Sequence, residues 1–192
     1  MTYTLLKFVH VLGAILIGAG LIGVWLSDLR SRQLRELGRF AEAVRNIAVF
    51  YDGLVVPGVL LLLASGTWFI VEFFGGWSFI KIPWLAGMVG LFLFEFVEGN
   101  TVTRLYFMRL RRLTDESLRL GSFTPELDNA RAESVPTCTH FLDLPMFLII
   151  VALGVIKRDT WSLFFISGVL ALFFATALTM YIPRLYPWGT AR

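Results

Sequence analysis

Three long stretches of the chain contain no charged residue. They cover residues 8–27, 53–71 and 160–183. About 20 consecutive apolar residues allow an α-helix to cross the ~30 Å hydrocarbon core of a bilayer, so each stretch predicts a membrane-spanning helix. Composition agrees, because 57% hydrophobic and 16% charged residues, with a mean hydropathy of +0.73, give more apolar side chain than a soluble domain of this size can bury.

Two further apolar segments, residues 82–94 and 144–156, are each bounded by charged residues. As helices they would be only about 20 Å long, so each spans a bilayer only if it takes a flanking charge inside. The sequence therefore predicts an all-α fold, a polytopic bundle of five transmembrane helices forming a single membrane domain over residues 1–192. The expected helices cover about 3–27, 47–72, 79–99, 136–157 and 161–182.

The arginines fix the expected orientation. Of the 17 basic residues, five lie in the loop 28–46, six in the loop 100–135 and two in the tail. Basic loops stay in the cytoplasm, so the chain is predicted to be N-out/C-in in a bacterial inner membrane. The pieces Ser31–Val44 and Thr103–Leu120 resemble amphipathic helices, which makes the lipid surface, and not nucleic acid, the expected partner of the positive charge.

Ionisable side chains inside a span cost about 2.5–3.5 kcal/mol on insertion scales, so they face the bundle and have partners. The predicted spans place two in an outer layer, His10 and Lys81. The predicted inner layer contains four intramembrane polar residues: Asp52, Glu95, His140 and Asp143.

His10 has two interpretations. Small residues follow on its helix face, which is typical of a close helix contact in which the imidazole bonds to a neighbour. The same face would also leave room for a flat cofactor bound by His10 as a metal ligand. Lys81 either reaches the outer headgroups or binds an anionic group such as a propionate. Met88, on the same face as Lys81, is either a soft axial ligand or core.

His140 and Asp143 are three positions apart and share a helix face. Asp143 either orients a metal-bound imidazole or belongs to a polar first turn that anchors the helix. The expected depths of His10 and His140 differ by about 15 Å along the membrane normal. Both therefore cannot bind one iron, because two ligand nitrogens lie only about 4 Å apart across a metal.

Several short motifs resemble the HemJ/CopD-like membrane proteins. They are LLKFVHVL over residues 5–12, Gly76-Trp77 shortly before Lys81, and FLDLP over residues 141–145. The chain looks most like the integral membrane proteins of unknown function near that superfamily. In HemJ-type protoporphyrinogen oxidases the helix-one histidine and the helix-three lysine are associated with haem, which implies these roles for His10 and Lys81. The chain departs from those oxidases in its fifth helix and in its fourth-helix acid, Asp143.

Three hypotheses of function follow. The first is a redox or electron-transfer protein that binds one haem b, or a related tetrapyrrole, through His10. It would exchange electrons with quinone, and if it is an enzyme, it is a membrane oxidoreductase. The second is a cofactor-free accessory subunit that packs against a respiratory complex or as a homo-oligomer. The third is a proton or solute transporter built on Asp52, Glu95 and Asp143. The residues assign no catalytic group.

Overall fold

The computed structural model describes residues 2–186, and every regular element within them is a helix. In chain order these elements are α1 (Thr2–Gln33), α2 (Leu37–Phe50), the π-helical turn η1 (Tyr51–Val55), α3 (Val56–Phe73), the 3-10 helix η2 (Gly76–Lys81), α4 (Pro83–Glu98), the π-helical turn η3 (Gly99–Thr103), α5 (Arg104–Leu120), α6 (Pro125–Arg131), α7 (Ser134–Ile156) and α8 (Ser162–Leu185).

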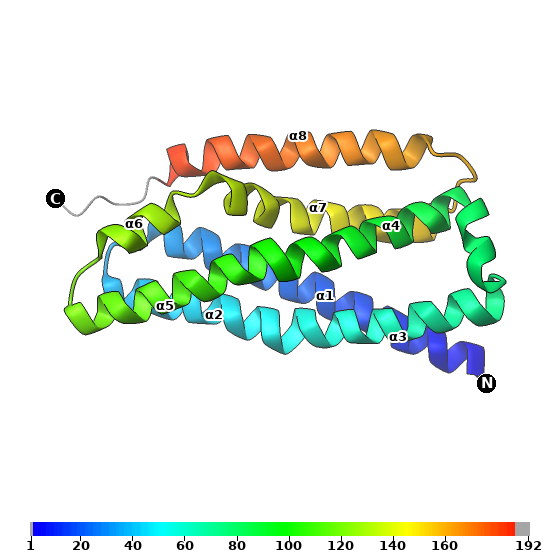
Figure 1. Ribbon diagram of the computed structural model, residues 1–192, viewed down its shortest axis with the longest axis horizontal. Helices are drawn as coiled ribbons and strands as arrows, with labels where there is room; N and C mark the ends of the chain where they lie inside the picture. Colours follow the sequence, from blue (N-terminus) through cyan, green and yellow to red (C-terminus); the bar gives the residue numbers. More distant parts are fainter. Residues whose placement is uncertain (1, 187–192) are drawn as a thin grey trace.

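Five of the helical units are long and apolar enough to cross a membrane, as predicted. Three are the single helices α1, α7 and α8. The other two are continuous rods in which a π-helical turn joins two α-helices, over Leu37–Phe73 and Pro83–Leu120. All five run roughly along the long axis of the bundle, and α8 ends at the end opposite to the start of α1 (Figure 1). The predicted all-α membrane bundle is confirmed.

The segments 28–46 and 100–135, expected as loops, are largely helical. The rod Pro83–Leu120 has 38 residues, which corresponds to about 57 Å of helix, far more than a ~30 Å membrane core requires. The helices continue past residues 27 and 99 into these segments because charge ends a hydrophobic run without ending a helix. The pieces Ser31–Val44 and Thr103–Leu120 are indeed mostly helical.

These extensions continue the hydrophobic core of the bundle into its arginine-rich end. Phe40, Leu110 and Leu127 are fully buried there. The guanidinium of Arg131 lies over two aromatic rings, 5.1 Å from the centre of Phe40 and 4.6 Å from that of Phe123. The pKa of Arg131 is below its usual value, because burial lowers it more than the ion pair with Asp128 raises it. This part of the core holds the two π-interrupted rods together outside the predicted lipid layer.

The small residues of α1 are covered by other helices of the same chain. A Cβ placed on Gly13 would lie 2.9 Å from the carbonyl oxygen of Gly58 on α3, and one placed on Gly58 would lie 2.8 Å from that of Gly13. Glycine at both positions lets the two backbones touch, as in other membrane helix pairs. The helix contact expected from the small residues after His10 is therefore present between α1 and α3.

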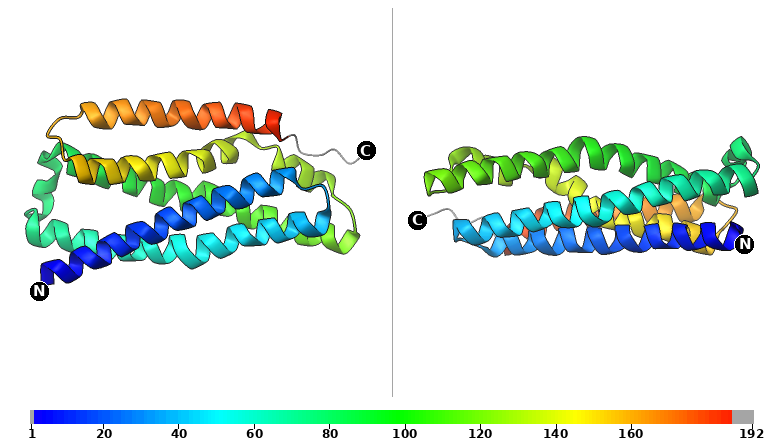
Figure 2. Two further views of the ribbon diagram at one scale, coloured as in Figure 1. Left: turned by 180° about the vertical axis from the view of Figure 1, so that it is seen from behind. Right: turned by 90° about the horizontal axis from the view of Figure 1, so that it is seen from below.

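The last helix, α8, packs along α7 on one side of the bundle (Figures 1 and 2). Its outward side carries large apolar side chains, among them Phe165, Val169 and Phe173. In a membrane these side chains face lipid tails. Helix α7 itself is the most buried of the five units, and it continues through Pro145 without ending. Polar side chains on its inner face therefore lie in the centre of the bundle.

Candidate metal site

Three carboxyl groups meet where α4 ends against α7. Glu95 and Glu98 lie in the last turn of α4, and Asp143 lies in the first half of α7. Two residues separated by three positions share a face of a helix, so both glutamates point toward α7. One oxygen of each of the three carboxyl groups lies within 4.8 Å of the others. The two helices thus bring three potential oxygen ligands to one point.

Two residues of this acidic cluster are buried, and Glu95 is half-buried. Asp143 is 4% exposed and Glu98 is 8% exposed. Asp143 Oδ1, Glu95 Oε1 and Glu98 Oε2 have no hydrogen-bond partner among the described residues. Within residues 2–186, no lysine or arginine forms an ion pair with any of the three. Three carboxyl groups at this spacing need protons or a bound cation to balance their charge, because unpaired buried charge is strongly destabilising.

A pocket of about 60 Å³ opens beside the cluster. Glu95 and Asp143 line it together with Tyr51 and Asn100, and apolar side chains of α1, α3, α4 and α7 complete its wall. By this measure a cavity needs about 10–15 Å³ to hold one water molecule. The pocket therefore has room for a cation with a water ligand.

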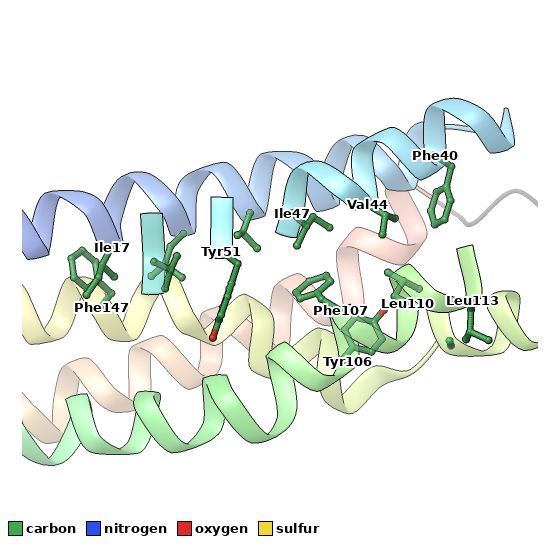
Figure 3. Close-up of a cluster of buried hydrophobic side chains, with 14 of the residues drawn as sticks. Ile17, Phe40, Val44, Ile47, Tyr51, Tyr106, Phe107, Leu110, Leu113 and Phe147 are labelled. Atoms are coloured by element: carbon green, nitrogen blue, oxygen red, sulfur yellow. The ribbon is translucent and has the colours of Figure 1, made fainter. Parts of the chain in front are cut away.

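Both π-helical turns border this pocket. Tyr51 begins η1 and Gly99 begins η3, and the hydroxyl of Tyr51 donates a hydrogen bond to the carbonyl oxygen of Gly99 at 3.0 Å. Figure 3 shows Tyr51 extending from its helix into the space between the rods, with Ile17 and Phe147 packed together on one side of it. A π-helical turn inserts one extra residue and is frequent at functional sites. Here residues of both turns line the pocket, Tyr51 and Val55 from η1 and Gly99 and Asn100 from η3.

A second polar group adjoins the acidic cluster. His140 lies one turn before Asp143 on α7 and is 1% exposed. Its Nδ1 is 4.0 Å from Asp143 Oδ2, and its Nε2 is 3.7 Å from Asp28 Oδ2 on α1. Asp28 in turn accepts a hydrogen bond of 2.8 Å from Nε of Arg32. The buried row Asp28, His140, Asp143 therefore leads from α1 to the acidic cluster.

The depth of the cluster follows from helix lengths. Glu95 lies about 18 Å along α4 from Pro83, and Asp143 lies about 20 Å along α7 from Ile156. Both starting points belong to the end of the bundle without the arginine-rich core (Figure 1). In a ~30 Å hydrocarbon layer the cluster then lies about 10 Å from the boundary on the arginine-rich side.

Of the four residues predicted for the inner layer, the structure brings three together, and Asp52 is elsewhere. The Asp52 side chain is 59% exposed and lies 3.4 Å from Nη2 of Arg104. Its place in the cluster is taken by Glu98. The π-helical turn that begins at Tyr51 decides which face Asp52 occupies, and that turn has no signature in the hydropathy pattern.

The residues predicted for the outer layer have separate surroundings. His10 Nδ1 is 2.9 Å from Oγ of Ser65 on α3, and its ring packs on Phe69. Lys81 is an exposed residue at the end of η2. Met88 packs with the α7–α8 core, its sulfur close to Gly154. No contact in the described residues joins these three side chains, so the structure does not assemble them as one ligand set.

Four residues of the site lay outside the predicted inner layer. Glu98 could have been found from its spacing to Glu95, since the two share a helix face. Asp28 and Arg32 are four residues apart, the spacing of a helical ion pair, although both fall in the segment expected as a loop. The involvement of Tyr51 has no signal in the sequence that we can identify.

Taken together, the fold and the buried cluster define a multi-pass integral membrane protein whose ionisable side chains converge inside the bundle. The chain belongs to a family described as predicted integral membrane protein (DUF2269), whose model matches residues 4–158. The match covers α1 to α7 and therefore includes every residue of the acidic cluster, while α8 lies beyond it. No match was found among curated proteins, and none among solved structures.

Proposed function

We propose that this protein is a cation transporter of the bacterial inner membrane, and that Glu95, Glu98 and Asp143 bind a divalent metal ion inside the bilayer. One observation carries the proposal: three carboxyl groups, two of them on buried residues, lie within 4.8 Å of one another without a lysine or arginine partner among the described residues. Hard and borderline divalent cations take carboxylate oxygens as ligands. A 2+ ion would balance most of the charge that the bundle buries.

The surroundings of the cluster support passage of the ion as well as binding. The pocket beside Glu95 and Asp143 offers space for a partly hydrated ion. With the arginine-rich end in the cytoplasm, as its charge predicts, the cluster would lie about 10 Å from the cytoplasmic boundary. The polar row through His140 and Asp28 runs toward that boundary. An ion at the cluster therefore has polar groups between it and the cytoplasm.

The test is metal uptake by liposomes that contain the purified full-length protein and an enclosed fluorescent dye quenched by Mn²⁺. We expect wild-type vesicles to take up Mn²⁺ at least about tenfold faster than empty vesicles. Asp143→Asn removes a ligand charge while keeping the side-chain volume, so its rate should fall to that of empty vesicles. Asp52→Asn, a charge-matched change outside the cluster, should leave uptake unchanged.

Equal uptake by wild-type and empty vesicles would contradict transport. Equal uptake by wild type and Asp143→Asn would contradict this site. A dye that reports internal pH, used in the same vesicles without metal, separates metal movement from proton movement. Proton flux that depends on Asp143 without any Mn²⁺ uptake would identify the cluster as a proton path and overturn the metal proposal.

A second candidate function is haem b binding at His10, the role that the resemblance to HemJ-type proteins implies. The hydroxyl of Ser65 donates to the carbonyl oxygen of Leu61 at 2.6 Å, so it accepts from Nδ1–H of His10. This leaves the Nε2 lone pair of His10 for a metal, the arrangement in which a second group fixes the tautomer of a ligating histidine. Neither Lys81 nor Met88 contacts His10 in the described part of the chain. His10 Nε2 would therefore be the axial ligand of the haem iron at this site.

With haem bound, the protein would exchange electrons with quinone or with a tetrapyrrole substrate. The test is a reduced-minus-oxidised absorbance spectrum of protein produced with added haem. The haem candidate predicts an α-band in wild type that disappears in His10→Ala and persists in His140→Ala. A spectrum without this band in wild type would exclude His10 as a haem ligand in this protein.

A further inference from the structure

The buried imidazole of His140 lies beside the acidic cluster without a hydrogen bond to either ring nitrogen within the described part of the chain, although the side chain is only 1% exposed. Rings of Trp25, Phe107 and Phe141 pack around it. Buried polar groups without partners are rare, and each calls for an explanation such as an unoccupied ligand position.

The two nitrogens of His140 face different acids. Asp28, on the Nε2 side, already pairs through its carboxylate with Arg32 at 2.8 Å. A carboxylate is an acceptor, so it favours the tautomer that carries hydrogen on Nε2. In that tautomer the lone pair is on Nδ1, and Nδ1 lies on the side of Asp143, 4.0 Å from its Oδ2.

This arrangement matches the usual surroundings of a metal-bound histidine. Such a histidine gives its second N–H to a carboxylate, which fixes its tautomer and orients its ring. Asp28 is in position for that role, with Arg32 holding the carboxylate. The distances of 3.7 and 4.0 Å exceed those of hydrogen bonds, so no hydrogen bond from residues 2–186 occupies Nδ1.

We infer that His140 is the nitrogen ligand of the metal bound by Glu95, Glu98 and Asp143, and that Asp28 is its positioning residue. This inference rests on the proposed function, because it presupposes a cation at the acidic cluster. A site of three carboxylates and one imidazole selects borderline transition-metal ions such as Mn²⁺, Fe²⁺ or Zn²⁺ over Mg²⁺ and Ca²⁺, which prefer oxygen ligands alone.

The experiment is electron spin echo spectroscopy of Mn²⁺ bound to the full-length protein in lipid nanodiscs. A directly bound imidazole nitrogen modulates the echo of the metal. The inference predicts this nitrogen signal in wild type and in His10→Ala, which removes the other histidine of the chain, and its loss in His140→Ala. The wild-type and His10→Ala spectra test the inference even if His140→Ala fails to fold.

Competition measurements complete the test. We expect Mn²⁺ and Zn²⁺ to bind at least about tenfold more tightly than Mg²⁺ and Ca²⁺. Asp28→Asn should weaken Mn²⁺ binding by about tenfold or more, the usual effect of removing a group that orients a ligand, and should retain the nitrogen signal. Unchanged affinity in Asp28→Asn would remove its positioning role.

The outcomes separate the two proposals. Mn²⁺ that binds with oxygen ligands only, or with a nitrogen signal lost in His10→Ala, would overturn the inference and leave the acidic cluster as a cation site. If Mn²⁺ does not bind at all, the proposed function itself fails. Metal that binds with the His140 nitrogen signal but is not taken up by vesicles would support the site and remove only the transport role.

Discussion

The hydroxyl of Tyr51 donates a 3.0 Å hydrogen bond to the carbonyl oxygen of Gly99, and this bond joins the two π-helical turns of the bundle. The two residues are far apart in sequence and belong to different rods. Their contact lies at the edge of the pocket that Glu95 and Asp143 also line. It therefore couples the spacing of the rods to the geometry of the acidic cluster.

Replacing Tyr51 with phenylalanine removes this bond while keeping the ring. We expect a loss of about 1 kcal/mol in the free energy of unfolding, the usual contribution of one hydrogen bond, and weaker Mn²⁺ binding, because the rods are less firmly held at the pocket. Thermal unfolding in detergent and Mn²⁺ titration measure the two effects. Tyr3→Phe, an exposed tyrosine, is the control, and a Tyr51→Phe protein identical to it would refute the coupling.

The contact of α1 with α3 depends on two glycines. Gly58→Ala places a methyl group 2.8 Å from the carbonyl oxygen of Gly13, and overpacking of this kind costs about 1–3 kcal/mol. Gly90→Ala is the matched control, because nothing lies within 4 Å of a Cβ placed there. We expect a lower unfolding temperature for Gly58→Ala and an unchanged or higher one for Gly90→Ala. The same temperature for both variants would be inconsistent with the close approach of the two helices.

The ion pair of Asp52 with Arg104 lies on the outside of the bundle, where the Asp52 side chain is 59% exposed and the Arg104 side chain 41% exposed. Exposed pairs contribute about 0–1 kcal/mol. Asp52→Asn should therefore change the unfolding temperature little and should leave Mn²⁺ affinity at the wild-type value. A large drop in affinity, measured by titration, would show that Asp52 acts on the cluster despite its position.

Metal affinity should depend on pH. Carboxyl groups and the imidazole bind metal only after losing their protons, so protons compete with the ion. Mn²⁺ affinity should therefore rise as pH increases from about 5 to about 8, and binding should release protons into a weakly buffered solution. Titrations across this range measure the effect, and an affinity that does not change with pH would argue against ligation by these groups.

The five spans could be predicted because hydropathy is a property of contiguous sequence. The three uncharged runs and the two shorter ones all correspond to helices that cross the bundle. The ends of the helices could not be predicted in the same way, since Asp28 and Arg32 continue α1 as a paired turn in which each compensates the other's charge. A hydropathy scale counts both residues as the end of the apolar run, although the helix continues through them.

The site was predictable only in part. Glu95, His140 and Asp143 stood out as charges near the ends of short apolar runs, and the structure brings them to neighbouring positions. Asp52 met the same criterion but lies outside, because the π-helical turn beginning at Tyr51 changes which residues face inward. Glu98 lies at the expected end of its helix, where a charged residue is usual, so the sequence did not mark it as part of a site. The direction in which a side chain points depends on tertiary packing that hydropathy does not record.

The most direct test of a metal ion at the acidic cluster is the manganese content of protein that has been stripped with a chelator, reloaded with Mn²⁺ and desalted. The account predicts about one Mn²⁺ per chain in wild type and in Asp52→Asn, and almost none in Asp143→Asn, because a structural or transport ion needs its full set of ligands. Wild-type protein without retained manganese, or the same content in Asp143→Asn, would contradict it.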